Sequence, residues 1–146
     1  MERFPPIEDL VPHAPPMLAL DRLVEWSDGR AVTTMSVPDR GPFARDGRVD
    51  ASWTLEFMAQ TVAACLGVEA FRSGVGVRVG MVIACRALEV KRPELGVGAR
   101  LRIEVTREHG TDEASRFRGE VREEGEEGEV VATAVMTLVH PEVGAE

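Results

Sequence analysis

One stretch of the chain is apolar on nearly every face and contains no proline. It covers residues 51–71, and its single interior glycine is Gly67. A run of this length without periodic polar positions predicts a buried α-helix. Asp50 or Ser52 can serve as its N-cap, and the Ser-Gly pair at 73–74 stands close to its C-terminal end.

The segments before this run are interrupted by proline and glycine. Prolines at positions 5, 6, 12, 15 and 16 predict an extended or irregular opening beyond one short turn around residues 7–11. Residues 17–26 and 30–37 are expected to pair as a hairpin in which Asp-Gly supplies the turn. Residues 39–50 are rich in glycine, proline and charge, and they predict a loop.

After the helical run the hydrophobic period shortens to two. Residues 99–106 and 117–122 alternate apolar with polar side chains, as half-buried strands do. Residues 79–90 and 130–139 are more uniformly apolar, which is typical of strands covered on both faces. Together with the hairpin, this order predicts an α+β fold in one domain, residues 1–146, with an antiparallel sheet of about six strands wrapped around one long helix.

Composition narrows the class of protein. The chain has 146 residues, a formal charge of -8 and a sequence pI near 5.0, so nucleic acid and anionic membrane surfaces are poor partners. No apolar run is long enough to cross a bilayer and the N-terminus lacks the build of a secretory signal, so we expect a cytoplasmic protein. Cys65 and Cys85 are expected to be buried free thiols, and three histidines without paired spacing predict no metal site and no cofactor.

The charge is unevenly distributed along the chain. Residues 1–71 carry a net charge of -5 and residues 108–129 carry -6, whereas residues 72–107 between them carry +5. Two interpretations of this basic block stay open: solvated strand faces, or a docking surface for an acidic partner. The basic residues concerned are Arg72, Arg78, Arg86, Lys91, Arg92, Arg100 and Arg102.

Glu56 is the first charged residue of the predicted helix, and it lies about a turn and a half from the start. Burial among apolar side chains would raise the pKa of its carboxyl group toward the range useful for acid–base catalysis. Alternatively, Glu56 reaches solvent at a subunit boundary or pairs with an arginine. Gln60, four residues later on the same helix face, can orient the carboxylate or bind backbone. Glu69, near the helix end, is expected at the surface.

The three histidines differ in their setting. His13 lies in the proline-rich residues 12–16, whose backbone is largely preset, and a rigid mounting favours catalysis. The alternative is a loop histidine with no function. His109 is expected in a turn and His140 at the end of the last strand, and neither suggests a site.

Three motifs are notable together. Residues 12–23 read PHAPPMLALDRL, residues 55–60 read LEFMAQ, and Arg92-Pro93 precedes GVGARL at residues 96–101. These stretches resemble, in the same order, the motifs of the hot-dog fold 3-hydroxyacyl-(acyl-carrier-protein) dehydratases, the FabZ/FabA-like family. LEFMAQ is the most specific of them, because it is similar to the family's Leu-Glu-x-Met-Ala-Gln. Asp46-Gly47 before the helix further resembles the predicted dehydratases of aryl-polyene pathways.

The resemblance implies a hot-dog dimer that converts a 3-hydroxyacyl thioester to the enoyl thioester in fatty acid, aryl-polyene or polyketide-like lipid synthesis. The acyl chain would be carried on an acidic acyl carrier protein, with coenzyme A as the other possible carrier. Glu56 would act at the hydroxyl group and a histidine of the partner protomer would act as the base. The expected substrate-binding residues are Met17, Trp53, Phe57 and Gln60, and the expected docking residues are Arg72, Arg78, Arg86, Lys91 and Arg92.

The sequence departs from the family at the catalytic histidine. FabZ-like enzymes carry it in a Gly-His-Phe-Pro-Gly loop before the helix, whereas this chain has Pro42 there, within Gly41-Pro42-Phe43-Ala44-Arg45. No histidine occurs between His13 and His109. Either His13 supplies the base or the protein does not dehydrate. The rigid proline segment and the presence of Glu56 favour His13.

Two other functions stay open. Related hot-dog thioesterases activate water with a helix carboxylate and no histidine, so thioester hydrolysis is one. The other is a non-catalytic acyl-binding subunit that pairs with a second, active hot-dog chain. The expected assembly is therefore a homodimer or higher oligomer, or a heterodimer with another hot-dog protein.

Overall fold

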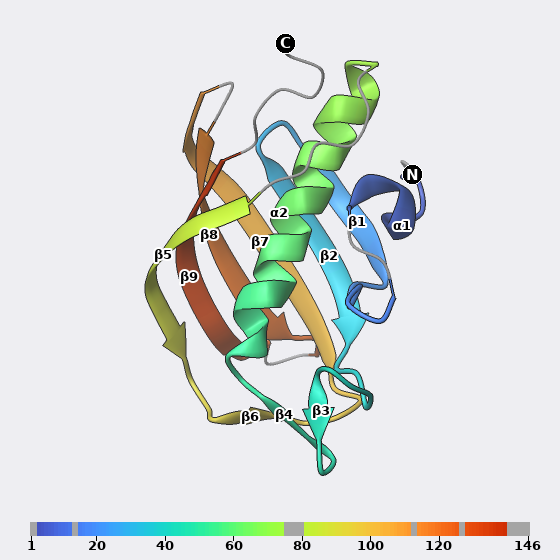
Figure 1. Cartoon of the computed structure of the whole chain (residues 1–146), viewed down its shortest axis with the longest axis vertical. Helices are drawn as coiled ribbons and strands as arrows, with labels where there is room; N and C mark the ends of the chain where they lie inside the picture. The colour runs from blue at the N-terminus through green and yellow to red at the C-terminus, as the bar shows by residue number, and fades with distance from the viewer. Residues whose placement is uncertain (1–2, 13–14, 75–80, 112–113, 126–127, 140–146) are drawn as a thin grey trace.

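One long helix, α2 (Trp53–Arg72), lies across one face of a curved six-stranded antiparallel sheet (Figure 1). The computed structural model describes residues 3–12, 15–74, 81–111, 114–125 and 128–139. The strand order in the sheet is β1-β2-β7-β8-β9-β5. The strands are β1 (Arg22–Ser27), β2 (Arg30–Ser36), β5 (Met81–Val90), β7 (Arg100–Gly110), β8 (Ala114–Glu123) and β9 (Val130–Val139). The predicted α+β architecture of one sheet around one helix is confirmed.

The apolar residues of α2 fill the space between the helix and the sheet. Fully buried side chains of the helix and of the strands form one core, which includes Phe57, Met58, Val62, Cys65, Ile103, Val105, Phe117 and Met136. The hydroxyls of Thr33 and Thr61 bond each other at 2.8 Å inside this core, so neither polar group is left unsatisfied. Although α2 is apolar, no helix in the described part of the chain is long and apolar enough to cross a membrane.

A short helix, α1 (Ile7–Leu10), packs directly on α2 at Gly67. A Cβ atom at position 67 would lie 2.0 Å from the backbone oxygen of Leu10. No side chain fits at that distance, so glycine is required where the two backbones meet. Ile7 and Leu10 are buried, and α1 thereby closes this side of the core.

A second, small sheet adjoins the start of α2. It contains β3 (Ala44–Arg45), β4 (Arg48–Asp50) and β6 (Glu94–Leu95) in the order β3-β4-β6. Asp46 and Gly47 both have positive φ, of 53° and 74°, and they turn the chain between β3 and β4. The prediction of a plain loop over residues 39–50 is therefore wrong, because strands of two and three residues are too short to produce a periodic pattern.

Strand β5 is exposed, contrary to the prediction of a strand covered on both faces. Its described side chains, residues 84–90, are all exposed, and Leu88 and Val90 keep 38% and 41% of their surface accessible. The strand lies at the edge of the sheet, with β9 as its neighbour. Cys85 shares this exposure, so the prediction of a buried free thiol holds for Cys65 alone.

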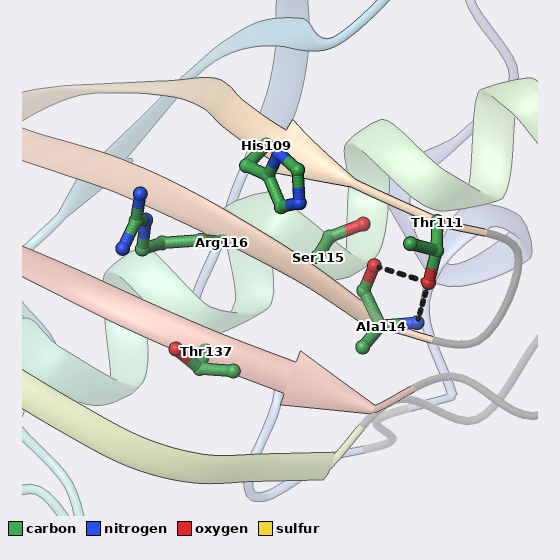
Figure 2. Close-up of a pocket in the computed structure, with 6 residues that line it drawn as sticks. All are labelled: His109, Thr111, Ala114, Ser115, Arg116 and Thr137. Atoms are coloured by element: carbon green, nitrogen blue, oxygen red, sulfur yellow. Dashed lines mark hydrogen bonds between the residues drawn. The ribbon is translucent and has the colours of Figure 1, made fainter.

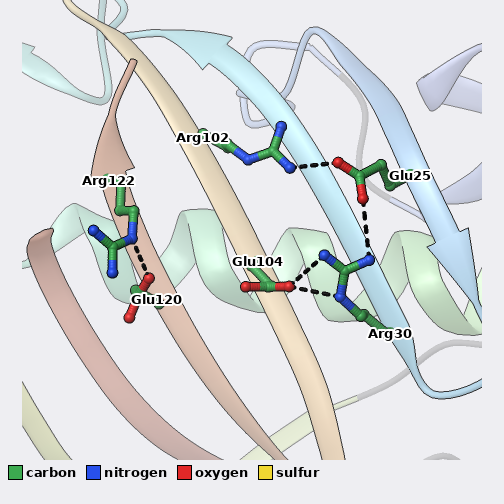
Figure 3. Close-up of polar contacts among 6 residues, drawn as sticks. All are labelled: Glu25, Arg30, Arg102, Glu104, Glu120 and Arg122. Atoms are coloured by element: carbon green, nitrogen blue, oxygen red, sulfur yellow. Dashed lines mark hydrogen bonds and ion pairs between the residues drawn. The ribbon is translucent and has the colours of Figure 1, made fainter. Parts of the chain in front are cut away.

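The face of the sheet turned away from α2 carries charged side chains in ion pairs (Figure 3). Arg30 Nε donates to Glu104 at 2.6 Å, and Glu25 accepts hydrogen bonds from both Arg30 and Arg102. Arg100 is likewise paired with acidic residues. Arg100 and Arg102 of the basic block therefore lie on a strand face on which both are paired with acidic side chains.

Candidate active site

Glu56 lies in the N-terminal part of α2 and borders an open hollow of about 350 Å³. The hollow is lined by Ser52, Trp53, Leu55, Glu56 and Ala59. The carboxylate is half-exposed, in contrast to the fully buried group that the apolar sequence context suggests. It is therefore accessible to a molecule that enters the hollow.

The side chain of Gln60 binds and orients the Glu56 carboxylate. This side chain is fully buried, and its Nε2 donates to Glu56 Oε2 at 2.7 Å and to the carbonyl oxygen of Met17 at 2.7 Å. Its Oε1 accepts from the backbone N–H of Ala19 at 2.9 Å. Gln60 thus does both things expected of it, since it orients the carboxylate and binds backbone. Because its amide is occupied within the chain, the geometry assigns Gln60 a positioning role for Glu56 and not direct contact with a ligand.

The aromatic residues expected around the substrate divide into two groups. Trp53 is half-buried and lines the hollow, whereas Phe57 is fully buried in the core. Phe43 connects them, with its ring 4.8 Å from that of Trp53 in an edge-on arrangement and 5.8 Å from that of Phe57. Met17 is half-buried, and its carbonyl oxygen binds Gln60. Trp53 is the residue of this set that lines the hollow.

The start of α2 is anchored by Asp50 and Thr54. Asp50 Oδ1 accepts the backbone N–H of Ser52 at 2.8 Å, and hydrogen bonds from Ser52 lower the pKa of the Asp50 carboxyl group. Thr54 Oγ1 donates to the carbonyl oxygen of Ala51 at 2.6 Å. The positive end of the helix dipole is thereby fixed beside the hollow, where it favours a ligand group that is or becomes negative.

No histidine is placed near Glu56 among the described residues. His13 lies outside the described residues, as does His140. His109 is on β7, two residues beyond Arg107. Arg107 binds Glu69 at the far end of α2, and the helix rise places Glu69 about 20 Å from Glu56. His109 there borders a second hollow of about 530 Å³ with Thr111, Ser115, Arg116 and Thr137 (Figure 2). Among the described residues, no cluster of histidine, cysteine, aspartate and glutamate suits a metal ion.

The basic residues expected to dock a carrier do not form one surface. Arg72 ends α2 and stacks over Trp26 at 4.6 Å, whereas Lys91 and Arg92 lie beside the start of α2, where Ala51 binds the next residue, Pro93. A helix of 20 residues separates these two ends by about 30 Å. The other two are Arg86, which is exposed on β5, and Arg78, which lies outside the described residues.

Charge pairing also reduces this basic surface. Arg92 Nη1 donates to Glu123 at 2.5 Å and its Nη2 donates to Glu129 at 3.3 Å, and Lys91 pairs with Glu89 at 3.4 Å. Glu123 and Glu129 lie outside residues 72–107, so their pairing with Arg92 partly neutralises the positive charge of that block. A count of charge along the chain cannot register such pairing.

The C-terminal end of α2 is built differently. Glu69, expected at the surface, is half-buried and accepts a hydrogen bond from Arg107 Nη2 at 2.7 Å. Trp26 Nε1 donates to the carbonyl oxygen of Cys65 at 3.1 Å. Burial raises the pKa of the Cys65 thiol to about 12, which keeps it protonated and unreactive. This end of the helix carries structural contacts.

One residue near the hollow carries no recognisable signal in the sequence. Arg40, in the loop before β3, donates to the carbonyl oxygens of Pro16 and Leu18 at 2.7 and 3.0 Å. The two partners lie 24 and 22 positions earlier in an irregular segment. Neither periodicity nor motif spacing connects such positions.

Comparisons with known proteins agree with this fold. A family model described as ApeP-like, ApeP dehydratase, matches residues 5–146. No curated protein matches the chain.

Several solved structures share the fold. One is a chain of the dehydratase heterocomplex ApeI:P from Xenorhabdus doucetiae, with a TM-score of 0.87, 24% identity, and coverage of 96% of this chain and 93% of that chain. Another is a hypothetical thioesterase with coenzyme A from Streptococcus pneumoniae, with a TM-score of 0.63, 13% identity, and coverage of 82% and 84%. The PaaI protein of the Escherichia coli phenylacetic acid degradation operon gives 0.61, 15%, and coverage of 83% and 79%. These likenesses establish the hot-dog fold.

Proposed function

The chain belongs to the ApeP-like dehydratase family, and on that premise we propose that it takes part in dehydrating a 3-hydroxyacyl thioester, carried on an acyl carrier protein, to the enoyl thioester. The observation that supports this most is the Glu56 carboxylate, oriented by buried Gln60 and open to a hollow at the N-terminal end of α2. Dehydration requires an acid at a leaving hydroxyl group, and Glu56 is proposed for that task.

The proposed reaction removes one proton from a carbon atom and donates one proton to the leaving hydroxyl group. A base removes the proton from the carbon next to the thioester carbonyl, and the electron pair forms the carbon–carbon double bond. The hydroxyl group leaves as water with the proton that Glu56 donates. Partial positive charge at the start of α2 stabilises the enolate oxygen that develops at the carbonyl. We propose His13 as the base, from the same or a partner protomer.

We further propose that the active assembly contains a second hot-dog chain. The exposed edge strand β5, with Leu88 and Val90 accessible, supports this, because an apolar edge left open in one chain is suited to pairing with another. The neighbour from Xenorhabdus doucetiae is itself a chain of a heterocomplex. Pro42 stands where FabZ-like enzymes carry histidine, so the proposed reaction depends on His13 for its base.

The carrier is proposed to dock at the N-terminal end of α2. Lys91 lies there, and the exposed Arg45 and Arg48 lie on the adjoining hairpin of β3 and β4. An acidic carrier held at this end would bring its acyl thioester to the Glu56 hollow. Binding is then expected to weaken as salt rises, because screening acts on exposed charges. An affinity unchanged between low and high salt would contradict electrostatic docking.

The test is product analysis by mass spectrometry. Purified chain, alone and co-purified with a hot-dog partner from the same source, is incubated with 3-hydroxyacyl thioesters of a carrier protein and of coenzyme A. Loss of water from the carrier-bound acyl group supports dehydration, and Glu56→Gln and His13→Ala should each lower the rate at least ~100-fold. Release of free carrier thiol without enoyl product would identify a thioesterase instead. Activity only with the partner that survives Glu56→Ala would identify a non-catalytic subunit.

A further inference from the structure

Residues 16–19 lie beside Gln60 although they belong to no strand. The backbone groups of Met17 and Ala19 on this side are partly or fully buried, and such groups need partners. The Met17 carbonyl and the Ala19 N–H bind Gln60 from the helix side. The carbonyls of Pro16 and Leu18 accept from Arg40, at 2.7 Å to Nη1 and 3.0 Å to Nη2. Two side chains from different elements therefore hold alternate residues of this segment.

Arg40 is itself fixed by the loop that carries it. Its carbonyl oxygen accepts the backbone N–H groups of Phe43 and Ala44 at 3.0 and 2.9 Å, which closes a turn. Its guanidinium carbon lies 5.2 Å from the centre of the Phe43 ring. Phe43 packs edge-on against Trp53, which lines the Glu56 hollow. One guanidinium group thus connects the segment around Met17 with the aromatic side of the hollow.

The geometry requires arginine in particular. Its planar guanidinium presents several donors in a rigid fork, so two nitrogens can reach two carbonyls of one segment at once. A lysine ammonium is a single point of charge and cannot reproduce that arrangement. Pro42 has no side chain that can transfer a proton. Residues 40–44 therefore contribute to the site through Arg40, which binds the segment of residues 16–19.

We infer that Arg40 is a positioning residue. It locks residues 16–19 against Gln60, and through Gln60 it keeps the Glu56 carboxylate aimed into the hollow. The catalytic consequence of this inference rests on the proposed dehydration, whereas the mechanical consequence, a rigid segment beside Gln60, does not. The two consequences can therefore be measured separately.

The mechanical test is residue-resolved amide hydrogen exchange by NMR on the whole chain. Arg40→Ala should speed exchange of the Ala19 N–H at least fivefold, because that N–H is held only if the segment stays seated on Gln60. Arg40→Lys should do the same, since it keeps the charge but not the fork. Arg45→Ala replaces an exposed arginine of the following strand, β3; it is the matched control and should leave exchange of the Ala19 N–H unchanged. Wild-type exchange at Ala19 in Arg40→Ala or Arg40→Lys would overturn the inference, whatever the chain catalyses.

The catalytic test uses Arg40→Ala and Arg40→Lys in the dehydration assay. Arg40→Ala should lower kcat about tenfold with KM within twofold and an unchanged melting temperature, and added guanidinium ion should restore part of kcat where sodium chloride does not. Unchanged kcat in Arg40→Ala would refute the positioning role. If the wild-type chain shows no dehydratase activity, alone and with its partner, the proposed function is refuted. The mechanical inference is then tested by amide hydrogen exchange of Ala19 alone.

Discussion

The two ends of α2 each carry one glutamate, and their surroundings differ. At the N-terminal end Glu56 is half-exposed on a hollow, and a neutral amide from Gln60 orients it. At the C-terminal end Glu69 is half-buried and paired with the charged guanidinium of Arg107. The Gln60 amide is a neutral hydrogen-bond donor, whereas the Arg107 guanidinium forms an ion pair with its glutamate. The first arrangement suits proton transfer and the second suits structure.

Backbone packing follows the same division. Near the C-terminal end the helix touches α1 so closely that Gly67 leaves no room for a side chain. Near the N-terminal end the neighbouring segment is hydrogen-bonded by the side chains of Gln60 and Arg40. The helix therefore meets its neighbour through backbone packing near one end and through side-chain hydrogen bonds near the other. Substitutions near the C-terminal end of α2 should therefore lower stability, whereas substitutions near its N-terminal end should lower the dehydration rate.

The largest expected effect is on stability, from Gly67→Ala. The added methyl group overlaps the Leu10 carbonyl, and because both atoms belong to backbone or Cβ positions, α1 must move. We expect a loss of about 3 kcal/mol in the free energy of unfolding, measured by urea denaturation.

Gly119→Ala is the matched control for this substitution. A Cβ at that position would lie 2.7 Å from Met58 Sδ, at the end of a flexible side chain that can move aside. The cost should be nearer 1 kcal/mol. Equal losses for the two variants would contradict the claim that the joint at Gly67 is a backbone contact.

A smaller loss is expected from Arg107→Met. The substitution leaves Glu69 half-buried without its cation and removes a guanidinium that lies 5.2 Å from the Phe117 ring centre. The hydrogen bond to Glu69 raises the pKa of Arg107, so its guanidinium group stays charged. We expect a loss of about 2 kcal/mol in urea denaturation, since one partner of the pair remains. In a double-mutant cycle with Glu69→Gln, additive losses would show that the two side chains do not interact.

The smallest effect is expected on the outer face of the sheet, from Glu25→Gln. Hydrogen bonds from Arg102 and then Arg30 lower the pKa of Glu25. A carboxyl group with a lowered native pKa stabilises the fold above its unfolded pKa, and this contribution is lost as pH falls through the native value. For an exposed network we expect about 0.5 kcal/mol at pH 7. Urea denaturation should show that the difference between the variants disappears in strong acid and shrinks in high salt; a difference independent of pH would argue against the ion pairs as its source.

Much of the fold follows from residue patterns. The unbroken apolar run predicts the helix within two residues of Trp53–Arg72, and alternation predicts β7 and β8, because burial on one face leaves a direct record in sequence. Strand β5 is the instructive error. The apolar composition of β5 predicts that its side chains are buried, but it does not indicate whether they are buried by this chain or by another one; in this chain its described side chains are exposed.

The site is only partly readable from sequence. Glu56 and Gln60 are four residues apart on one helix, so their contact at 2.7 Å follows from helix geometry. Arg40 reaches its partners across an irregular loop, and no local rule connects them. The spatial arrangement of the basic block is hidden for a related reason, since Arg72 ends α2 whereas Lys91 follows β5 and lies beside the start of that helix.

The most direct test of the division along α2 compares Glu56→Gln with Glu69→Gln in both melting temperature and dehydration rate. Glu56→Gln should lose at least ~100-fold in rate and keep the wild-type melting temperature, whereas Glu69→Gln should keep the rate and melt at a lower temperature. The opposite assignment, or the same loss of rate in both variants, would contradict this division.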